Sequence, residues 1–142
     1  MGEFSIEGDI EISGDALWAV IRNFGDVSWI PGDPKPEWEG EGVGMVRIVR
    51  VPPLPIAKER LDAIDEEARA VHYTVIEGNP MPVRDYHASM RAVDLGGGRS
   101  RLVWSSAWEP DGVTEEEARE KVGQLYAGVL GFAKKNLEAR YA

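Results

Sequence analysis

Hydrophobic and polar residues alternate over most of the chain, in runs bounded by glycine, proline and asparagine. In the first run, 4–12, Phe4 and three isoleucines alternate with polar neighbours, which is the pattern of a strand with one buried face. Short turns separate most of the later runs, and such turns favour antiparallel pairing. Further strands are expected at 45–51, 57–65, 69–77, 83–93 and 101–109.

Two segments change to the 3.6-residue period of a helix. Ser13 is a suitable N-cap for a short helix that ends near Gly25, and we expect a further helical turn over 26–30. The longer helix begins with the capping box 114–117 and runs to about residue 140. Its apolar stripe consists of Ala118, Val122, Leu125, Tyr126, Val129, Leu130, Ala133 and Leu137.

The order of these elements predicts an α+β fold in a single domain, 1–142. We expect a curved antiparallel sheet of about seven strands around the long C-terminal helix, with short helices after the first strand. Such an arrangement buries the helix stripe and can enclose a cavity. Gly123, Gly128 and Gly131 interrupt the helix, each at a cost of about 1 kcal/mol relative to alanine. They indicate either close packing or a bend, or else room for a ligand.

One predicted strand places a carboxylate, Glu59, on its apolar face. The apolar residues on this face are Ala57, Leu61 and Ala63. A buried carboxylate is costly without a partner, so we expect Arg47 or a tyrosine hydroxyl to satisfy it. An apolar interior with a few converging polar groups is typical of small-molecule sites. The polar and aromatic side chains that the same reasoning turns inward are Arg47, Glu59, Tyr73, Tyr86, Trp104 and Ser106, with Tyr126 from the helix.

Composition excludes several classes of partner. The 142 residues carry a formal net charge of −9, without the clustered basic surface that nucleic acid or an anionic membrane requires. The absence of cysteine excludes thiol catalysis, disulfides and thiolate metal sites. No apolar run approaches the roughly 20 residues of a membrane-spanning helix, and the acidic, alternating start is unlike a signal peptide. We therefore expect a cytoplasmic protein.

The two histidines occupy the alternate strand positions that face away from the predicted cavity. His72 and His87 therefore belong on the outer face, and no spacing of histidines and carboxylates suggests a zinc site. The glycine-rich stretches 40–44 and 95–100 have no following Walker lysine and no strand–turn–helix context. We expect neither a metal nor a cofactor.

The order and spacing of several segments resemble a known superfamily. HYTVIEGNPMPVRDYHASMRAV, a glycine-rich turn, SRLVWSSAWEPDG and the long helix resemble the START-like helix-grip (SRPBCC) superfamily, which includes the major birch pollen allergen. The pattern is most similar to polyketide cyclase/dehydrase-type bacterial proteins and plant lachrymatory factor synthases. WIPGDPKPEWEGEGVGMVR is similar to the early region of the family, so the resemblance covers nearly the whole chain.

This resemblance implies a seven-stranded antiparallel sheet that grips the C-terminal helix over a hydrophobic cavity. Plant synthases of this type work with an arginine and a glutamate in the cavity, and these match Arg47 and Glu59. The helix aromatic would be Tyr126, where a tryptophan is expected. The other aromatic positions match Tyr73, Tyr86 and Trp104.

Each candidate residue also has a structural interpretation. Glu59 is a general acid/base, the partner of an ion pair, or exposed by a slipped strand register. Arg47 stabilises an oxyanion or is a surface arginine, because Arg50 is equally available. Tyr73 and Tyr86 bind a ligand oxygen or complete the core. The other candidates for the pocket, which also have packing roles, are Trp104, Ser106, Tyr126, Leu130 and, at an entrance, Trp29 and Trp38.

These patterns together predict a protein that binds a small hydrophobic, oxygen-bearing ligand. If it is an enzyme, we expect cofactor-free cyclase, dehydratase or isomerase chemistry in which Glu59 moves a proton and Arg47 stabilises negative charge. The alternatives are a non-catalytic carrier or sensor of a lipid or metabolite and, third, a chaperone-like module with a large exposed apolar patch. Both a monomer and a homodimer are compatible with the sequence.

Overall fold

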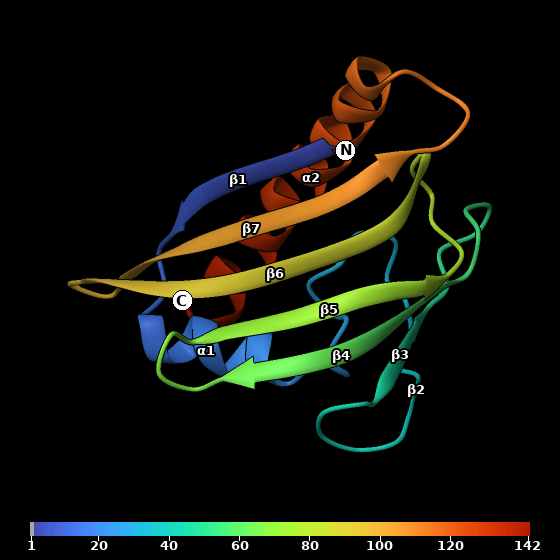
Figure 1. Ribbon diagram of the computed structural model, residues 1–142. Helices are drawn as coiled ribbons and strands as arrows, with labels where there is room; N and C mark the ends of the chain where they lie inside the picture. The colour runs from blue at the N-terminus through green and yellow to red at the C-terminus, as the bar shows by residue number, and fades with distance from the viewer. Residues whose placement is uncertain (1) are drawn as a thin grey trace.

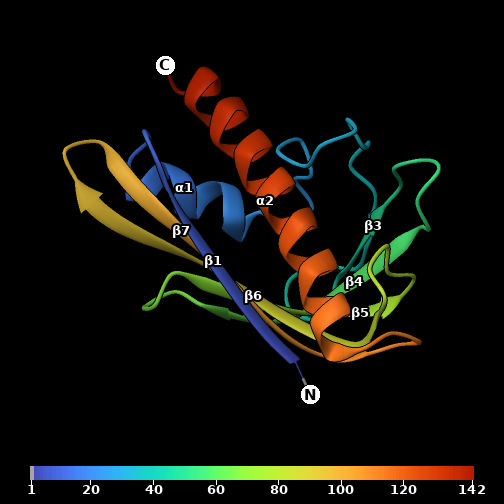
Figure 2. The ribbon, with the colours of Figure 1, turned by 90° about the horizontal axis from the view of Figure 1, so that it is seen from above.

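The computed structural model describes residues 2–142, in which a long helix crosses the concave face of a curved antiparallel sheet (Figure 1, Figure 2). The sheet has seven strands in the order β1-β7-β6-β5-β4-β3-β2. This arrangement confirms the expected α+β fold. The elements are β1 (Gly2–Ile10), α1 (Gly14–Arg22), β2 (Trp38–Glu39), β3 (Val46–Val49), β4 (Ala57–Asp65), β5 (Ala70–Glu77), β6 (Val83–Gly96), β7 (Arg99–Pro110) and α2 (Glu115–Arg140).

Both helices begin where the sequence supplies a capping side chain. The Ser13 hydroxyl accepts a hydrogen bond from the Ala16 N–H at 3.1 Å, and the Thr114 hydroxyl accepts one from the Glu117 N–H at 3.1 Å. The prediction of a further helical turn over 26–30 is wrong. This segment forms non-helical turns and bends. There the Asp26 carboxylate accepts the Ser28 N–H at 3.0 Å, a local bond that competes with helix formation.

Two β-bulges set which side chains face the concave side. In β4 the register shifts between Leu61 and Ala63, so that Ala63 pairs with His72 and Ile64 pairs with the buried Val71. The prediction that Ala63 faces inward is therefore wrong, because an extra residue reverses the alternation. In β6 the bulge contains Asp85, whose φ is 52°. Bulges bend strands, and these two help to curve the sheet.

The concave face has a closed end and a loop end. At the closed end, α1 packs against β5 and β6, and the C-terminal part of α2 lies nearby (Figure 1). Arg140 of α2 forms an ion pair with Asp26 at 3.5 Å, and Glu138 accepts the Glu11 N–H at 2.9 Å.

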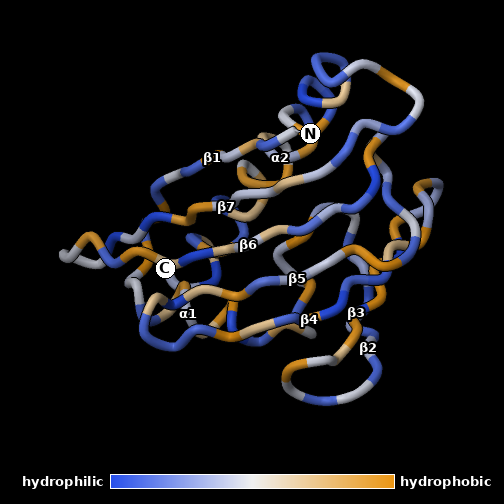
Figure 3. Tube along the Cα trace, viewed as in Figure 1, coloured by the Kyte–Doolittle hydropathy of each residue, from blue (hydrophilic) through white to orange (hydrophobic). Residues whose placement is uncertain are grey.

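Figure 3 shows apolar positions alternating with polar ones along the strands. Within residues 2–142, no helix combines the length and hydrophobicity that crossing a bilayer requires.

The glycines of α2 differ in their surroundings. A Cβ atom at Gly123 would lie 3.2 Å from the Phe4 ring, so this glycine lets the helix approach β1 closely. Gly128 and Gly131 are exposed, and a Cβ atom at either would have no neighbour within 4 Å. Close packing therefore explains the first glycine but not the other two.

Candidate functional site

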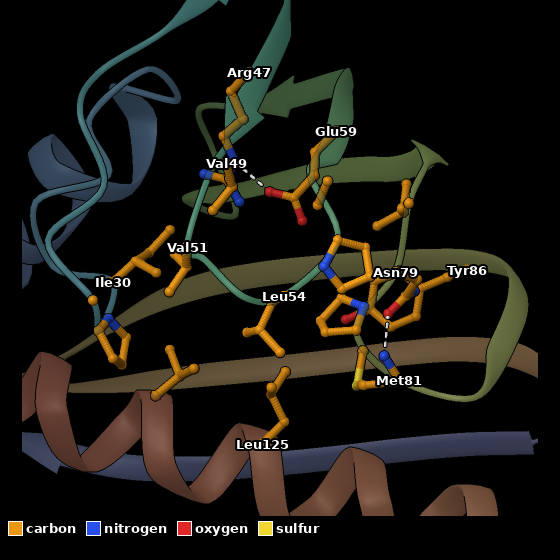
Figure 4. Close-up of a pocket in the computed structure, with 18 of the residues that line it drawn as sticks. Ile30, Arg47, Val49, Val51, Leu54, Glu59, Asn79, Met81, Tyr86 and Leu125 are labelled. Carbon is orange, nitrogen blue, oxygen red and sulfur yellow. Dashed lines mark hydrogen bonds and ion pairs between the residues drawn. The ribbon is translucent and has the colours of Figure 1, made fainter.

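A cavity of about 260 Å³ lies between the concave face and α2 (Figure 4). Its walls come from β3, β4, β5, β6 and β7 on one side and from Leu125 and Val129 of α2 on the other. Most of the lining is aliphatic or aromatic. The residues of the lining that are exposed at the surface, and therefore mark the mouth, are Gly32, Leu54, Pro55 and Pro80.

Three loops form this mouth at the loop end of the sheet. They are 30–32, 51–55 and 78–81. Gly78 has φ of 62°, and a Cβ atom there would lie 2.0 Å from the Ile56 carbonyl oxygen, so only glycine allows these two loops to touch. Asn79 then closes a turn, because its Oδ1 accepts the Met81 N–H at 3.0 Å. The mouth therefore depends on the close approach at Gly78 and on the turn that the Asn79 side chain closes.

The polar part of the cavity is an ion pair between Arg47 and Glu59. Antiparallel pairing of β3 with β4 places the two residues opposite each other, and Arg47 Nε donates to Glu59 Oε1 at 2.6 Å. The side chains are 4% and 14% exposed, respectively. Figure 4 shows the second carboxylate oxygen of Glu59 directed toward the cavity. The slipped register that would expose Glu59 does not occur.

Arg47 is held by more than the carboxylate. Its Nη1 donates to the Phe24 carbonyl at 3.3 Å, and its guanidinium carbon lies 4.0 Å from the centroid of the Phe24 ring and 5.1 Å from that of Tyr73. Arg50, by contrast, is exposed and pairs with Glu37 on the surface. Arg47 is therefore the arginine that faces the cavity.

An aromatic network forms the wall beside this ion pair. Trp104 Nε1 donates to the Tyr73 hydroxyl at 3.0 Å, and the Trp104 ring stacks on Tyr126 with centroids 3.6 Å apart and an interplanar angle of 5°. The Tyr126 and Tyr86 hydroxyls are hydrogen-bonded to each other. Burial raises the pKa of all three tyrosines above the ordinary value, so they are neutral donors or acceptors at pH 7.

Six of the ten candidate residues line the cavity. The four that do not are Ser106, Tyr126, Leu130 and Trp38, of which Trp38 is exposed. Tyr126 is fully buried behind Trp104, and Leu130 packs against Gly8 of β1. Ser106 is buried on β7, in register with Phe4 and Ala88. The residues that line the cavity are Trp29, Arg47, Glu59, Tyr73, Tyr86 and Trp104.

Sequence reasoning missed the lining that comes from loops and from one side of the helix. Leu125 and Val129, four residues apart, belong to the predicted stripe, but the stripe alone does not tell the side facing the sheet from the side facing the cavity. Ile30, Leu54 and Met81 are apolar residues in proline-containing loops. Apolar side chains within such loops were the only available signal.

The outer face of the sheet carries the histidines. His72 and His87 are exposed, and His87 Nδ1 lies 2.9 Å from the Thr74 hydroxyl, which in turn is hydrogen-bonded to Asp62. Across residues 2–142, no cluster of three or more histidine, aspartate or glutamate side chains has the geometry to hold a metal ion. The charged and phenolic groups that line the cavity are the Arg47 guanidinium, the Glu59 carboxylate and the Tyr73 and Tyr86 hydroxyls.

Comparison with known proteins agrees with this geometry. The family model described as "Polyketide cyclase / dehydrase and lipid transport" matches residues 1–138. None of the curated protein sequences compared with the chain matches it.

Solved structures show the same fold. An uncharacterised protein from Bacillus thuringiensis is 23% identical, with a TM-score of 0.83 over 96% of this chain and 98% of that one. Norcoclaurine synthase from Thalictrum flavum, in complex with dopamine and hydroxybenzaldehyde, is 21% identical, with a TM-score of 0.73 over 99% and 88%. The ZhuI aromatase/cyclase from a Streptomyces species is 18% identical, with a TM-score of 0.73 over 99% and 93%. The chain belongs to the polyketide cyclase/dehydrase and lipid transport family, within the helix-grip superfamily that its sequence resembles.

Proposed function

We propose that the protein binds a small, hydrophobic, oxygen-bearing molecule in this cavity and moves a proton on it without a cofactor. The observation that carries the proposal is the Arg47–Glu59 pair inside an otherwise apolar cavity, with one carboxylate oxygen directed inward (Figure 4). Buried ion pairs contribute little net stability, and replacing one by apolar residues of similar volume is often neutral. Stability alone is therefore a weak reason for a charged pair at this position.

In the proposed reaction Glu59 acts as general base and then as general acid. Its free oxygen takes a proton from a carbon next to a ligand carbonyl, and the electron pair of that C–H bond moves onto the carbonyl oxygen. Arg47 stabilises the resulting oxyanion. Return of the proton to another atom of the ligand completes an isomerisation. In a cyclisation the enolate carbon attacks a second carbonyl of the ligand, whose π electron pair moves onto its oxygen, and Glu59 returns the proton to that oxygen. In a dehydration the enolate electron pair expels a hydroxyl group from the β carbon, which leaves as water after taking the proton from Glu59.

The aromatic side chains bind and shield the ligand in this proposal. Tyr73 and Tyr86 orient ligand oxygens, while Trp104 and Trp29 form apolar walls that limit access of water. Two of the similar structures carry the names of enzymes, a synthase and an aromatase/cyclase. Their identity to this chain is low, so they support the class of chemistry and not a substrate.

Deuterium exchange on a simple ketone tests this function. We expect 2-tetralone to bind in the cavity and to exchange the protons next to its carbonyl for deuterium faster than in protein-free buffer, as followed by proton NMR in D₂O. Glu59→Gln should lower the catalysed rate by about 100-fold or more, because general acid–base catalysis contributes roughly that much. Glu37→Gln is the matched control, because Glu37 forms an equivalent arginine pair on the surface.

The second candidate function is a non-catalytic carrier or sensor that uses the same cavity. It is favoured if 2-tetralone binds but wild type and Glu59→Gln exchange its protons equally slowly. Failure of the wild type to bind any apolar ketone would contradict both functions. Native mass spectrometry of protein purified from its own host would then identify the molecule that accompanies it.

A further inference from the structure

The Tyr73 hydroxyl has a hydrogen that no acceptor in the described chain receives. Trp104 Nε1 donates to the Tyr73 oxygen at 3.0 Å, and an indole nitrogen can only donate, so Tyr73 must accept in this bond. Its own O–H is then left over, although a phenol is also a donor. Tyr73 is only 2% exposed and lines the cavity. Bulk water therefore has little access to this donor.

The direction of the O–H follows from the position of Trp104. A phenolic hydrogen prefers the plane of its ring, which gives it two orientations. If the Tyr73 O–H pointed toward Trp104, its hydrogen would meet the hydrogen of the indole N–H. The Tyr73 O–H therefore takes the opposite orientation. The charged groups that act on Tyr73 are Glu59 and Arg47, which both line the cavity, and the Arg47 guanidinium carbon lies 5.1 Å from the centroid of the Tyr73 ring.

Trp104 is itself held in place by stacking on Tyr126. Its indole lies on the Tyr126 ring at 3.6 Å with an angle of 5°, and both residues are buried. The Tyr126 hydroxyl is hydrogen-bonded to Tyr86. Tyr126 does not line the cavity, yet this stack restricts rotation of Trp104 and so fixes where its N–H points.

We propose that Trp104 is a positioning residue that makes Tyr73 an oriented donor, so that the cavity selects ligands with an acceptor oxygen. This inference rests on the proposed function and adds to it the two residues that select for the ligand oxygen, Tyr73 as the donor and Trp104 as the residue that orients it. A site with a desolvated donor rejects an analogue of the same shape that cannot accept a hydrogen bond, because the donor is then left unpaired. Carbonyl compounds are therefore selected over hydrocarbons of the same shape.

A pair of probes with the same shape tests the selection. 2-Acetonaphthalene carries a carbonyl oxygen where 2-isopropenylnaphthalene carries a methylene group. In calorimetric titration we expect the wild type to bind the ketone about 10-fold more tightly than the hydrocarbon, which is the usual size of one good hydrogen bond. Tyr73→Phe should abolish the preference. Trp104→Phe should reduce it at least threefold, although Tyr73 keeps its hydroxyl.

Trp108 provides the matched control on the same strand. It is buried and faces the same side four residues further on, but it does not line the cavity, and its Nε1 has no hydrogen-bond partner in residues 2–142. Trp108→Phe removes an indole N–H of the same kind and should leave the preference for the ketone unchanged. If Trp104→Phe does not fold, Tyr126→Leu removes the stack without changing either hydrogen-bonding residue, and it should also reduce the preference.

The outcomes separate this inference from the proposed function. A merely structural role of Trp104 would weaken both probes equally and leave their ratio intact, which would overturn the inference. Equal binding of the two probes by the wild type would also overturn it, while proton exchange on 2-tetralone that depends on Glu59 would leave the function standing. Absence of binding by both probes and by 2-tetralone would contradict the function itself.

Discussion

The space between α2 and the sheet is filled differently at the closed end and at the loop end of the concave face. At the closed end Ile10, Leu17 and Leu137 are almost completely buried. Toward the loop end, Leu125 and Val129 of the same helix face a cavity instead. Tightly filled cores supply stability, whereas an empty volume costs dispersion contacts. The fold therefore concentrates stability at the closed end and leaves a cavity toward the loop end.

Polar groups follow the same division. The buried charged pair and the Tyr73 donor lie along the cavity. The three fully buried side chains of the closed end named above, Ile10, Leu17 and Leu137, are aliphatic. Buried polar groups require partners, and a cavity can receive a partner from outside the chain. This difference between the two ends yields four predictions, taken from the largest expected effect to the smallest.

Truncation of a leucine should give the largest difference in stability between the two ends. Leu137→Ala at the closed end should lower the free energy of unfolding by about 3 kcal/mol, because it creates a new cavity in a filled core. Leu125→Ala, which enlarges an existing cavity, should cost about 1 kcal/mol. Urea unfolding followed by circular dichroism measures both. Equal losses would show that the two ends are packed alike.

Removal of one ion-pair partner should have the next largest effect. Arg47→Met leaves the Glu59 carboxylate unpaired in a largely buried position and should cost about 2 kcal/mol. Adding Glu59→Leu to that variant should restore most of the loss, since neither charge then remains. Arg50→Met on the surface should change stability by less than about 1 kcal/mol. A double variant no more stable than Arg47→Met would contradict the account.

Alkaline pH should destabilise the protein through its buried phenols. A phenol in the unfolded chain titrates near pH 10, whereas burial raises the pKa of Tyr73, Tyr86 and Tyr126 in the folded protein. Their contribution is complete below pH 10 and decreases as the pH rises, by up to about 1.4 kcal/mol per pH unit for each phenol. Tyr86→Phe should reduce the slope of stability against pH between 10 and 11. An unchanged slope would argue against a buried neutral phenol.

Alanine at the exposed helix glycines should have the smallest effect and the opposite sign. Gly128→Ala should raise the free energy of unfolding by about 1 kcal/mol, because alanine favours the helix and a Cβ atom there meets nothing. Gly123→Ala serves as the comparison, since its Cβ atom would crowd the Phe4 ring and the gain should be lost. Thermal unfolding measures both variants. A stabilising Gly123→Ala would show that the helix has room to move away from β1.

The sequence allowed much of the fold to be predicted because its signals are local. Alternation located the strands, and Ser13 and Thr114 located the helix starts, since capping depends on a few neighbouring residues. The wrong face for Ala63 has a physical cause as well. A bulge depends on how two strands pair, and the alternation within a single strand does not reveal it.

The candidate site was predictable where it lies on strands and not where it depends on packing. Arg47 and Glu59 were placed together because strand parity turned both inward. Tyr126 and Leu130 share a stripe with Leu125 and Val129, and only the position of the helix over the sheet decides which of them reach the cavity. The loops of the mouth come together through the fold as a whole, so apolar side chains within them were the only signal in the sequence.

Methyl NMR with 2-acetonaphthalene tests the central claim, a ligand cavity at the loop end, most directly. The account predicts saturable shifts of the methyl groups of Val75, Met90 and Val129, which line the cavity, and none at Leu17 and Leu137 of the closed end. Glu59→Gln should leave this map in place. Shifts confined to the outer face of the sheet, or spread equally over both ends, would contradict the account.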